Sequence, residues 1–421
     1  MVIGSEIRKR CHVNTNEEGD RFVGIKADSD DVVVYFPVGY HLPENETDIK
    51  RDILHLFQVL AEFTDSSDRV LAMNKFEAPQ SVDFPINAYL EVIYYFMEKN
   101  GYYMETEPIY KTRDRGNIDW AKTIQRQRAL IQSNFSPVYI QYTVRESTPN
   151  ENKLITHIHR HCVYESFSKL GWLFTPYMPE PPQIPLDIKR FIIALNDKLA
   201  TTYNDKDKKL FRSMKAMLEY MDEKPSVKQF YFGTDYFENV WEKLIDRVFG
   251  IKNKKDYFPR TRWRLQKGKH KEKYPLEPDS IMIHNDKIYV LDAKYYRYGI
   301  SGNPDHLPDS SSINKQITYG EYIQRQRNLP NESLYNAFIM PFNAAKNYFG
   351  ITAPFGNIGE AVGDWKGDTF YYERIQGIVV DTRYLMYHYT GNSKKSIIAL
   401  AESIEKALIE NNGVLPQTSS E

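Results

Sequence analysis

Hydrophobic and polar positions follow two different periods along the chain, which predicts a mixture of helices and strands. Apolar residues at helical spacing predict helices over residues 45–63, 86–100, 150–170, 186–222, 235–249, 314–323 and 393–409. Short apolar or alternating runs predict strands at 31–37, 102–110, 281–283, 288–291, 338–340 and 375–380. Because helices and strands are interleaved, we expect an α/β fold, α+β overall.

The predicted elements divide the chain into three parts. Five prolines between 176 and 185 oppose both helix and central strand, which marks a linker. A chain of 421 residues also exceeds what one core usually organises. We therefore predict a separate N-terminal α+β domain over 1–170, a proline-rich linker with connector helices over 171–228, and a C-terminal domain over 229–421.

The most informative pattern is a pair of apolar runs around a polar tetrad, in the segment EPDSIMIHNDKIYVLDAK, residues 277–294. The tetrad predicts a tight turn centred on Asn285-Asp286 that joins two antiparallel strands. In that register Asp279 lies opposite Asp292. Opposed residues hold their Cβ atoms roughly 4.5–5.5 Å apart, and like charges there destabilise a sheet. The hairpin therefore needs a compensating positive charge.

A divalent cation would supply that charge. Mg²⁺ binds through one or two carboxylates together with water and phosphate oxygens, and Mn²⁺ could replace it. Lys294 projects from the same face as Asp292, because side chains alternate along a strand. An ammonium group beside a metal site can orient an attacking water or stabilise charge that develops on a phosphate. The alternative is an ordinary hairpin with solvated acids and a surface lysine.

The segments on both sides of the hairpin carry further polar candidates. Upstream, the predicted helix 235–249 has an apolar stripe, with Glu238 at its edge and Glu242 one turn further on. Downstream, the predicted helix 314–323 carries Gln316 and Tyr319. For either glutamate taken alone, a solvated helix face is an equally good interpretation.

A local basic cluster lies between the glutamate helix and the hairpin. Residues 251–274 hold ten Lys or Arg and two acids, whereas the formal charge of the whole chain is −1. Phosphate binding needs only a local positive field, and interleaved aromatic residues such as Trp263 can stack on bases. We predict DNA contacts from the basic side chains Arg260, Arg262, Arg264, Lys267, Lys269 and Lys271. A solvated, flexible loop is the alternative.

Other features exclude several classes of site. With only Cys11 and Cys162, the chain offers no disulfide framework and no cysteine-rich zinc site. His157 and His161 share a helix face, but no third ligand has fitting spacing, so a structural role is favoured. No apolar run approaches the ~20 residues of a membrane span, and the start lacks the apolar core of a signal peptide. We expect a soluble, cytoplasmic protein without membrane contact.

Pro278-Asp279 followed by Asp292-Ala293-Lys294 resembles the PD-(D/E)xK motif of the restriction-endonuclease-like nucleases, with Asp as the second acid. Together with the segments 115–123 and 150–159 and the helix that carries Glu238, it resembles the LlaJI family of type II restriction endonucleases and, more distantly, the McrC nuclease subunits. The resemblance runs from about residue 85 to 390 and is strongest over 229–325. The first ~80 residues carry nothing that matches.

The resemblance implies that the C-terminal domain, 229–421, is a PD-(D/E)xK nuclease domain with a restriction-endonuclease-like mixed-sheet core flanked by helices. It also implies roles for the candidate residues. Asp279 and Asp292 would ligate Mg²⁺, and Glu238, or Glu242, would complete the metal shell. Lys294 would assist the attacking water. Gln316 and Tyr319 resemble the Gln-and-Tyr helix of several such nucleases, although residue 320 is Gly and departs from the common spacing.

The resemblance also implies a function: a Mg²⁺-dependent endonuclease of a restriction system that hydrolyses double-stranded foreign DNA. Such chains resemble partners of McrB-like AAA+ GTPases, and the sequence has no G-x-x-x-x-G-K-[ST] phosphate loop, so we expect no nucleotide on this chain. Because one centre cuts one strand, we expect a homodimer or assembly by a partner. Two alternatives remain: a non-catalytic DNA-binding or assembly subunit, and a repair-type nuclease that acts on free ends or flaps.

Overall fold

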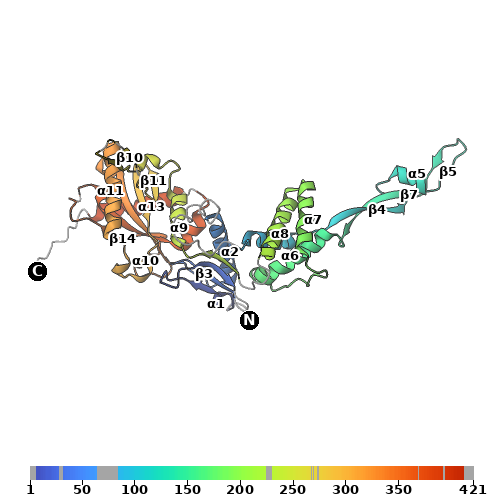
Figure 1. The fold of residues 1–421 in the computed structure, drawn as a ribbon, viewed down its shortest axis with the longest axis horizontal. Helices are drawn as coiled ribbons and strands as arrows, with labels where there is room; N and C mark the ends of the chain where they lie inside the picture. The colour runs from blue at the N-terminus through green and yellow to red at the C-terminus, as the bar shows by residue number, and fades with distance from the viewer. Residues whose placement is uncertain are drawn as a thin grey trace. The chain divides into compact units, whose positions relative to one another are not determined.

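The computed structural model describes residues 6–27, 32–63, 84–223, 230–266, 268, 270–272, 275–367, 369–391 and 394–411. The chain forms two compact units (Figure 1). One combines Met1–Asp83 with Lys228–Glu421, and the other is Phe84–Val227. The division differs from the predicted one, because the N-terminal residues pack with the C-terminal part and the proline-rich segment belongs to the inserted unit.

The core of the discontinuous unit is a five-stranded mixed sheet in the order β11-β12-β13-β15-β14. Its strands are β11 (Ser280–His284), β12 (Lys287–Ala293), β13 (Leu334–Phe342), β14 (Phe355–Ala361) and β15 (Ile375–Asp381). The three inner strands are parallel, and the two edge strands run antiparallel to their neighbours. This mixed sheet with flanking helices confirms the predicted α+β class.

The β11–β12 hairpin has the predicted register, with Ile283 opposite Ile288. Asn285 and Asp286 form the turn, and both have left-handed backbone angles, with φ of 48° and 60°. Two successive left-handed residues are typical of the hairpin turn whose twist matches that of the strands. The turn therefore sets the register that carries through to the far end of the hairpin.

Three long helices cover this sheet: α9 (Phe237–Phe249), α11 (Ser310–Arg327) and α13 (Lys394–Asn411). The buried residues of α9 are those of the predicted apolar stripe, and α9 packs on β11 and β12. On the face covered by α11, Tyr319 packs with Val290 of β12. On the other face, Glu405 of α13 accepts hydrogen bonds from Lys287 and Tyr289. The sheet is thus buried on both sides.

The N-terminal segment completes the same unit with a second sheet in the order β1-β3-β2-β8. Its elements are α1 (Glu6–Lys9), β1 (Cys11–Val13), β2 (Val23–Ala27), β3 (Val32–Phe36), α2 (Glu46–Phe63) and β8 (Phe230–Thr234). Asp52 of α2 is fully buried and receives two hydrogen bonds from Arg383 of α12 (Thr382–His388). This ion pair joins α2 to α12.

The inserted unit consists of packed helices and a long ribbon. The helices are α4 (Ile86–Lys99), α6 (Leu154–Leu170), α7 (Ile188–Thr201) and α8 (Asp205–Glu223). The ribbon pairs β4 (Glu105–Arg113) with β7 (Tyr142–Asn150), and beyond it lie α5 (Trp120–Arg126), β5 (Leu130–Ile131) and β6 (Pro137–Val138). Figure 1 shows this ribbon projecting from the helices of its own unit, with α5 and β5 toward its far end.

Shorter elements connect the main ones. They are the helix α10 (Tyr298–Ser301) and the 3-10 turns Gly171–Leu173, Lys255–Tyr257, Pro304–His306, Asn331–Ser333 and Tyr371–Glu373. No helix in the described part of the chain is both long enough and apolar enough to span a membrane.

Candidate active site

The open end of the β11–β12 hairpin brings three predicted residues together. Extending the observed register by one pair places Asp279 opposite Asp292. Asp279 Oδ2 accepts a hydrogen bond of 2.8 Å from the Ala293 N–H, and Lys294 Nζ lies 2.7 Å from Asp292 Oδ2. Asp292 is only 3% exposed, so this ion pair is screened little by water.

The carboxylates of the site repel one another. Burial raises the pKa of Asp279 to about 8, and the charges of Asp292 and Glu242 add to this shift. Burial, followed by the charge of Asp292, also raises the pKa of Glu242. Burial lowers the pKa of Lys294, but Asp292 and Asp279 outweigh that effect and the net shift is upward. The cluster holds more negative charge than Lys294 balances.

The structure distinguishes the two candidate glutamates of α9. Glu242 interacts with Asp292 and Lys294, as its pKa shift shows. Glu238 lies one turn away, and its pKa is raised by burial and lowered in part by its own backbone and by Arg21. Glu242 is therefore the glutamate that interacts electrostatically with Asp292 and Lys294, and the metal-ligand role of Glu238 stays a prediction. Both project from one side of the helix, and sequence spacing alone does not separate them.

Two hydrogen bonds fix the backbone that leads into Asp279. Lys254 Nζ donates to the Asp279 carbonyl at 2.5 Å and also to Asp246 Oδ1 at 2.9 Å. From the other side, the hydroxyl of the buried Tyr319 donates to the Glu277 carbonyl at 2.9 Å. Lys254 was not singled out from the sequence, where it is one of many cations in the basic segment.

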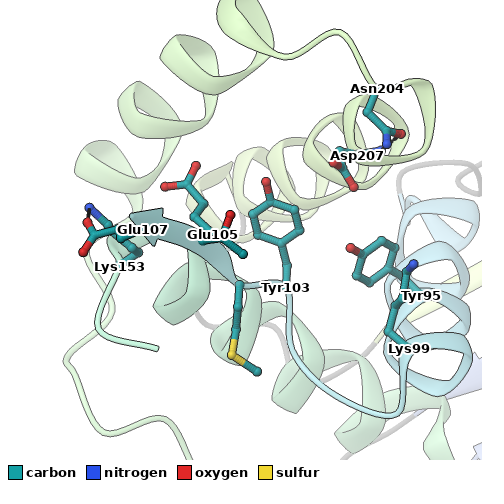
Figure 2. Close-up of a pocket in the computed structure, with 10 residues that line it drawn as sticks. Tyr95, Lys99, Tyr103, Glu105, Glu107, Lys153, Asn204 and Asp207 are labelled. Atoms are coloured by element: carbon teal, nitrogen blue, oxygen red, sulfur yellow. Dashed lines mark hydrogen bonds and ion pairs between the residues drawn. The ribbon is translucent and has the colours of Figure 1, made fainter. Parts of the chain in front are cut away.

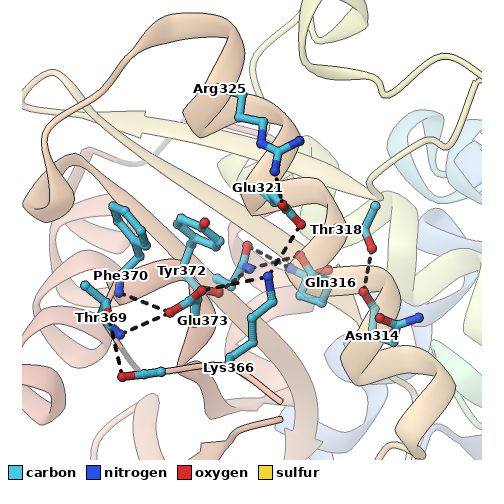
Figure 3. Close-up of polar contacts among 12 residues, drawn as sticks. Asn314, Gln316, Thr318, Glu321, Arg325, Lys366, Thr369, Phe370, Tyr372 and Glu373 are labelled. Carbon is cyan, nitrogen blue, oxygen red and sulfur yellow. Dashed lines mark hydrogen bonds and ion pairs between the residues drawn. The ribbon is translucent and has the colours of Figure 1, made fainter. Parts of the chain in front are cut away.

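Gln316 has a structural environment. It is 1% exposed, and its Nε2 donates to the Val290 carbonyl at 2.7 Å. Asn336 Nδ2 donates to the carbonyls of Gln316 and Tyr372, at 2.9 and 2.7 Å (Figure 3). These bonds hold α11 against β12 and β13, and they place Gln316 in the core rather than on a DNA-contacting surface.

Lys315, the neighbour of Gln316, is the side chain of α11 that reaches the cluster from solvent. It is exposed, its charge lowers the pKa of Glu242 in part, and its Nζ lies 5.6 Å from the centre of the Tyr319 ring. The sequence analysis missed it, because Lys315 lies just before Gln316 and outside the Gln-and-Tyr spacing.

The predicted DNA-binding side chains lie partly on a two-stranded ribbon. Arg262 and Arg264 are exposed on β9 (Arg262–Arg264), which pairs with β10 (His270–Glu272), and Arg260 is exposed just before it. The side chain of Trp263 is 60% exposed between the two arginines. Lys271 contributes backbone to β10, whereas Lys267 and Lys269 lie outside the described residues.

The acid cluster fits a hard divalent cation. Within the described ranges, no three His, Cys, Asp or Glu side chains converge on a common metal position, and His161 is instead bonded to the Ile184 carbonyl at 2.9 Å. Mg²⁺ needs only one or two carboxylates and takes water at its other positions. Burial and the neighbouring carboxylates raise the pKa of Asp279, and the positive charge of such an ion would oppose that shift.

A separate hollow of about 640 Å³ lies in the inserted unit and has a different character (Figure 2). Its lining includes Tyr103, Glu105, Glu107, Lys153 and Asp207. Glu107 forms an ion pair with Lys153, and Glu105 pairs with Lys198. Because these two glutamates already have cationic partners, the hollow shows no sign of an activated acid.

Comparisons with known proteins agree with the hairpin motif. The model of the LlaJI restriction endonuclease family matches residues 22–359. The chain belongs to this family. A curated relative is the type II restriction enzyme BsuMI component YdjA of Bacillus subtilis (strain 168), which is 26% identical over 358 residues. The match covers 80% of this chain and 75% of the relative.

A solved assembly of Thermococcus gammatolerans McrB AAA+ hexamers with bound McrC is also similar to this LlaJI-family chain. The identity is 14%, the match covers 94% of this chain and 83% of the other, and the TM-score is 0.38, which is too low to support a conclusion. The family match corrects the predicted extent of the resemblance, because it starts at residue 22 rather than near 85 and ends at 359. It covers the Asp279–Lys294 hairpin, and family membership makes this chain a nuclease of a restriction system.

Proposed function

We propose that this LlaJI-family chain is a Mg²⁺-dependent endonuclease that hydrolyses phosphodiester bonds in double-stranded DNA. One observation carries the proposal: Asp279 and Asp292 are held against each other at the end of a hairpin, with Lys294 beside them. Two opposed carboxylates lower the stability of a hairpin. The arrangement is therefore expected for a site that recruits a cation rather than for one that only supports the fold.

Asp279 and Asp292 would hold Mg²⁺ or Mn²⁺, with Glu242 nearby as an outer or second-ion ligand. Bound there, the ion supplies positive charge to the phosphate oxygens. Lys294 is oriented by its ion pair with Asp292, so its ammonium can hold the attacking water and stabilise the charge that develops on phosphorus. Attack by water forms one P–O bond and breaks the bond to the 3′-oxygen, leaving a 5′-phosphate and a 3′-hydroxyl.

The β9–β10 ribbon offers a surface for the DNA. Arg260, Arg262 and Arg264 point their charges into solvent within the sequence segment that leads to the hairpin. Their contacts would be mainly with phosphates, so binding should weaken steeply as salt rises. The exposed ring of Trp263 can stack on a distorted base step. Cleavage of both strands would require two copies of this centre, from a homodimer or from assembly by a partner.

The far end of the β4–β7 ribbon favours a protein partner. Its exposed large apolar side chains are Trp120, Ile124, Leu130, Ile131, Phe135, Val138 and Ile140. Such a group of exposed apolar residues marks an interaction site, and the arginines exposed beside it are Arg113, Arg115, Arg126 and Arg128. We propose that an McrB-like AAA+ GTPase subunit binds here. Ile131→Ser with Phe135→Ser should abolish co-purification with such a subunit while the chain stays folded.

The decisive experiment incubates the purified chain and Mg²⁺ with covalently closed circular DNA, with and without a candidate GTPase subunit. We expect cleavage by the wild type and none by Asp292→Ala. Glu405→Gln is the matched control, because Glu405 contacts β12 from its other face, through Lys287 and Tyr289, and should leave cleavage unchanged.

Each other outcome identifies an alternative. Cleavage by Asp292→Ala at the wild-type rate would remove the proposed site. Metal-independent DNA binding without scission would indicate a non-catalytic assembly subunit. Cleavage of linear but not circular DNA would indicate a repair-type nuclease.

A further inference from the structure

The backbone that follows Lys294 is held by the N-terminal part of the chain. Tyr295 is 4% exposed, and its hydroxyl accepts a hydrogen bond of 2.7 Å from the Val38 N–H. The carbonyl of Tyr295 accepts a bond of 3.0 Å from Asn16 Nδ2. Two residues further on, Arg297 forms an ion pair with Glu17. Three contacts from one N-terminal segment therefore converge on residues 295–297.

The loop that supplies Asn16 is itself braced. The Asp20 carboxylate accepts bonds from the Thr15 N–H at 2.8 Å, the Thr15 hydroxyl at 2.9 Å and His12 Nε2 at 2.9 Å. Asn16 has a φ of 55°, a conformation that Asn, Asp and His adopt more readily than other residues with side chains. The turn thus presents the amide of Asn16 in a fixed direction.

Tyr295 also connects the lysine strand to the glutamate helix. Its ring lies 5.3 Å from that of Phe237 and 6.0 Å from that of Trp241, both on α9. Trp241 Nε1 donates to the Ile339 carbonyl at 3.1 Å, and the Lys294 N–H donates to the same carbonyl at 2.9 Å. One packed group therefore sets the position of Lys294 relative to the helix that carries Glu242.

We propose that Asn16 and Tyr295 are positioning residues of the nuclease centre, and that the N-terminal loop holds the Lys294 backbone so that its ammonium stays on Asp292. The inference rests on the proposed nuclease function. A lysine has four rotatable side-chain bonds, so its aim depends on a fixed backbone. A displacement of about 1 Å at a reacting group can cost about 10²-fold in rate.

The test compares three variants of the full chain. Asn16→Asp removes the amide donor but keeps the size of the side chain and its tolerance of the left-handed backbone. Asn16→His restores an N–H donor with the same tolerance. Asn331→Asp is the matched control, because Asn331 Nδ2 likewise donates to a distant carbonyl, that of Thr369 at 2.8 Å, just before the start of β13 and at the end of the strand opposite to the site.

Two readouts separate positioning from general stability. For Asn16→Asp we expect the single-turnover cleavage rate at saturating DNA to fall about tenfold or more, with the DNA Kd unchanged. Hydrogen exchange at the amides of 294–297 should rise about tenfold. Asn16→His should stay within about threefold of wild type in both, and Asn331→Asp should match wild type.

The exchange measurement needs no cleavage, so it tests the contact even if the proposed nuclease function fails. Wild-type exchange and rate in Asn16→Asp would overturn the proposal. An equal loss of rate in Asn331→Asp, or a loss that follows weaker DNA binding, would also overturn it.

Discussion

The acids of the hairpin and the acids of the hollow in the inserted unit show opposite electrostatics. Lys153 and Asn150 hold the pKa of Glu107 below its ordinary value, whereas burial and the neighbouring carboxylates raise the pKa of Asp279 to about 8. In the hollow, Glu105 and Glu107 each have a lysine partner. At the hairpin, the partly buried Lys294 forms an ion pair with Asp292, while Asp279 and Glu242 add further negative charge nearby.

This difference separates charge that supports the fold from charge that is available for chemistry. A surface acid that is paired with a lysine adds little to the stability of the fold, because water also solvates both charges. A buried cluster with surplus charge is costly in the absence of a cation, and it persists only where the rest of the fold enforces it. The imbalance, rather than the presence of a cavity, marks the site.

The largest expected effect comes from removing a lysine, either Lys294 at the hairpin or Lys153 at the hollow. Lys294→Ala should lower the single-turnover cleavage rate by about 10³-fold with DNA binding nearly unchanged, because its role lies in the transition state. Lys153→Ala removes the partner of Glu107 and should leave the rate unchanged. Equal rates in the two variants would contradict the comparison.

Stability without metal should depend on pH through Asp279. A carboxyl whose pKa is raised from 3.8 to about 8 on folding binds more protons in the folded state, so stability is full below about pH 4 and falls as pH rises toward 8. At ~1.4 kcal/mol per pKa unit, the loss by pH 8 is on the order of 5 kcal/mol. Urea unfolding of Asp279→Asn should show a flatter pH profile and greater stability at pH 8.

Added Mg²⁺ provides the complementary measurement. It should stabilise the wild type more at pH 8 than at pH 5, because only ionised carboxylates attract the ion. Stabilisation of Asp279→Asn to the same extent would place the ion elsewhere.

An intermediate effect should distinguish the two glutamates of α9. Glu242→Gln should slow cleavage by about 10- to 100-fold, since Glu242 interacts electrostatically with Asp292 and Lys294, whereas Glu238→Gln should stay within about threefold. The measurement is the cleavage rate as a function of Mg²⁺ concentration. The reverse order would restore Glu238 as the third ligand.

The smallest effect belongs to the hollow. Glu105→Gln removes one partly exposed ion pair with Lys198, so we expect the melting temperature to change by less than about 2 °C. Cleavage should not change at all. A loss of cleavage here would show that paired acids of the inserted unit contribute to the reaction.

The hairpin and its register are predictable because they depend on local chemistry. Asn285 and Asp286 adopt the left-handed turn without strain, and the turn then determines every pair up to the end of the strands. The apolar stripe of α9 is predictable for the same reason, since helical periodicity reports which side is buried.

Long-range partners are not encoded in such periodicity. Glu238 and Glu242 lie one turn apart on the same helix, and only the packing of α9 on the sheet brings Glu242 to Asp292. Gln316 looks like a functional polar residue until Val290 and Asn336 are placed around it. The pairing of β2 with β8 joins residues on either side of the inserted unit in the sequence, and no local sequence pattern predicts it.

The inserted unit also affects the order of events on the ribosome. β2 must wait for β8, from residue 27 to residue 230, which takes about 10–40 s at ordinary synthesis rates. The contact between Asn16 and Tyr295 forms later still. A nascent chain therefore lacks the Asp279–Lys294 hairpin, and the N-terminal contact that holds it, during most of its synthesis.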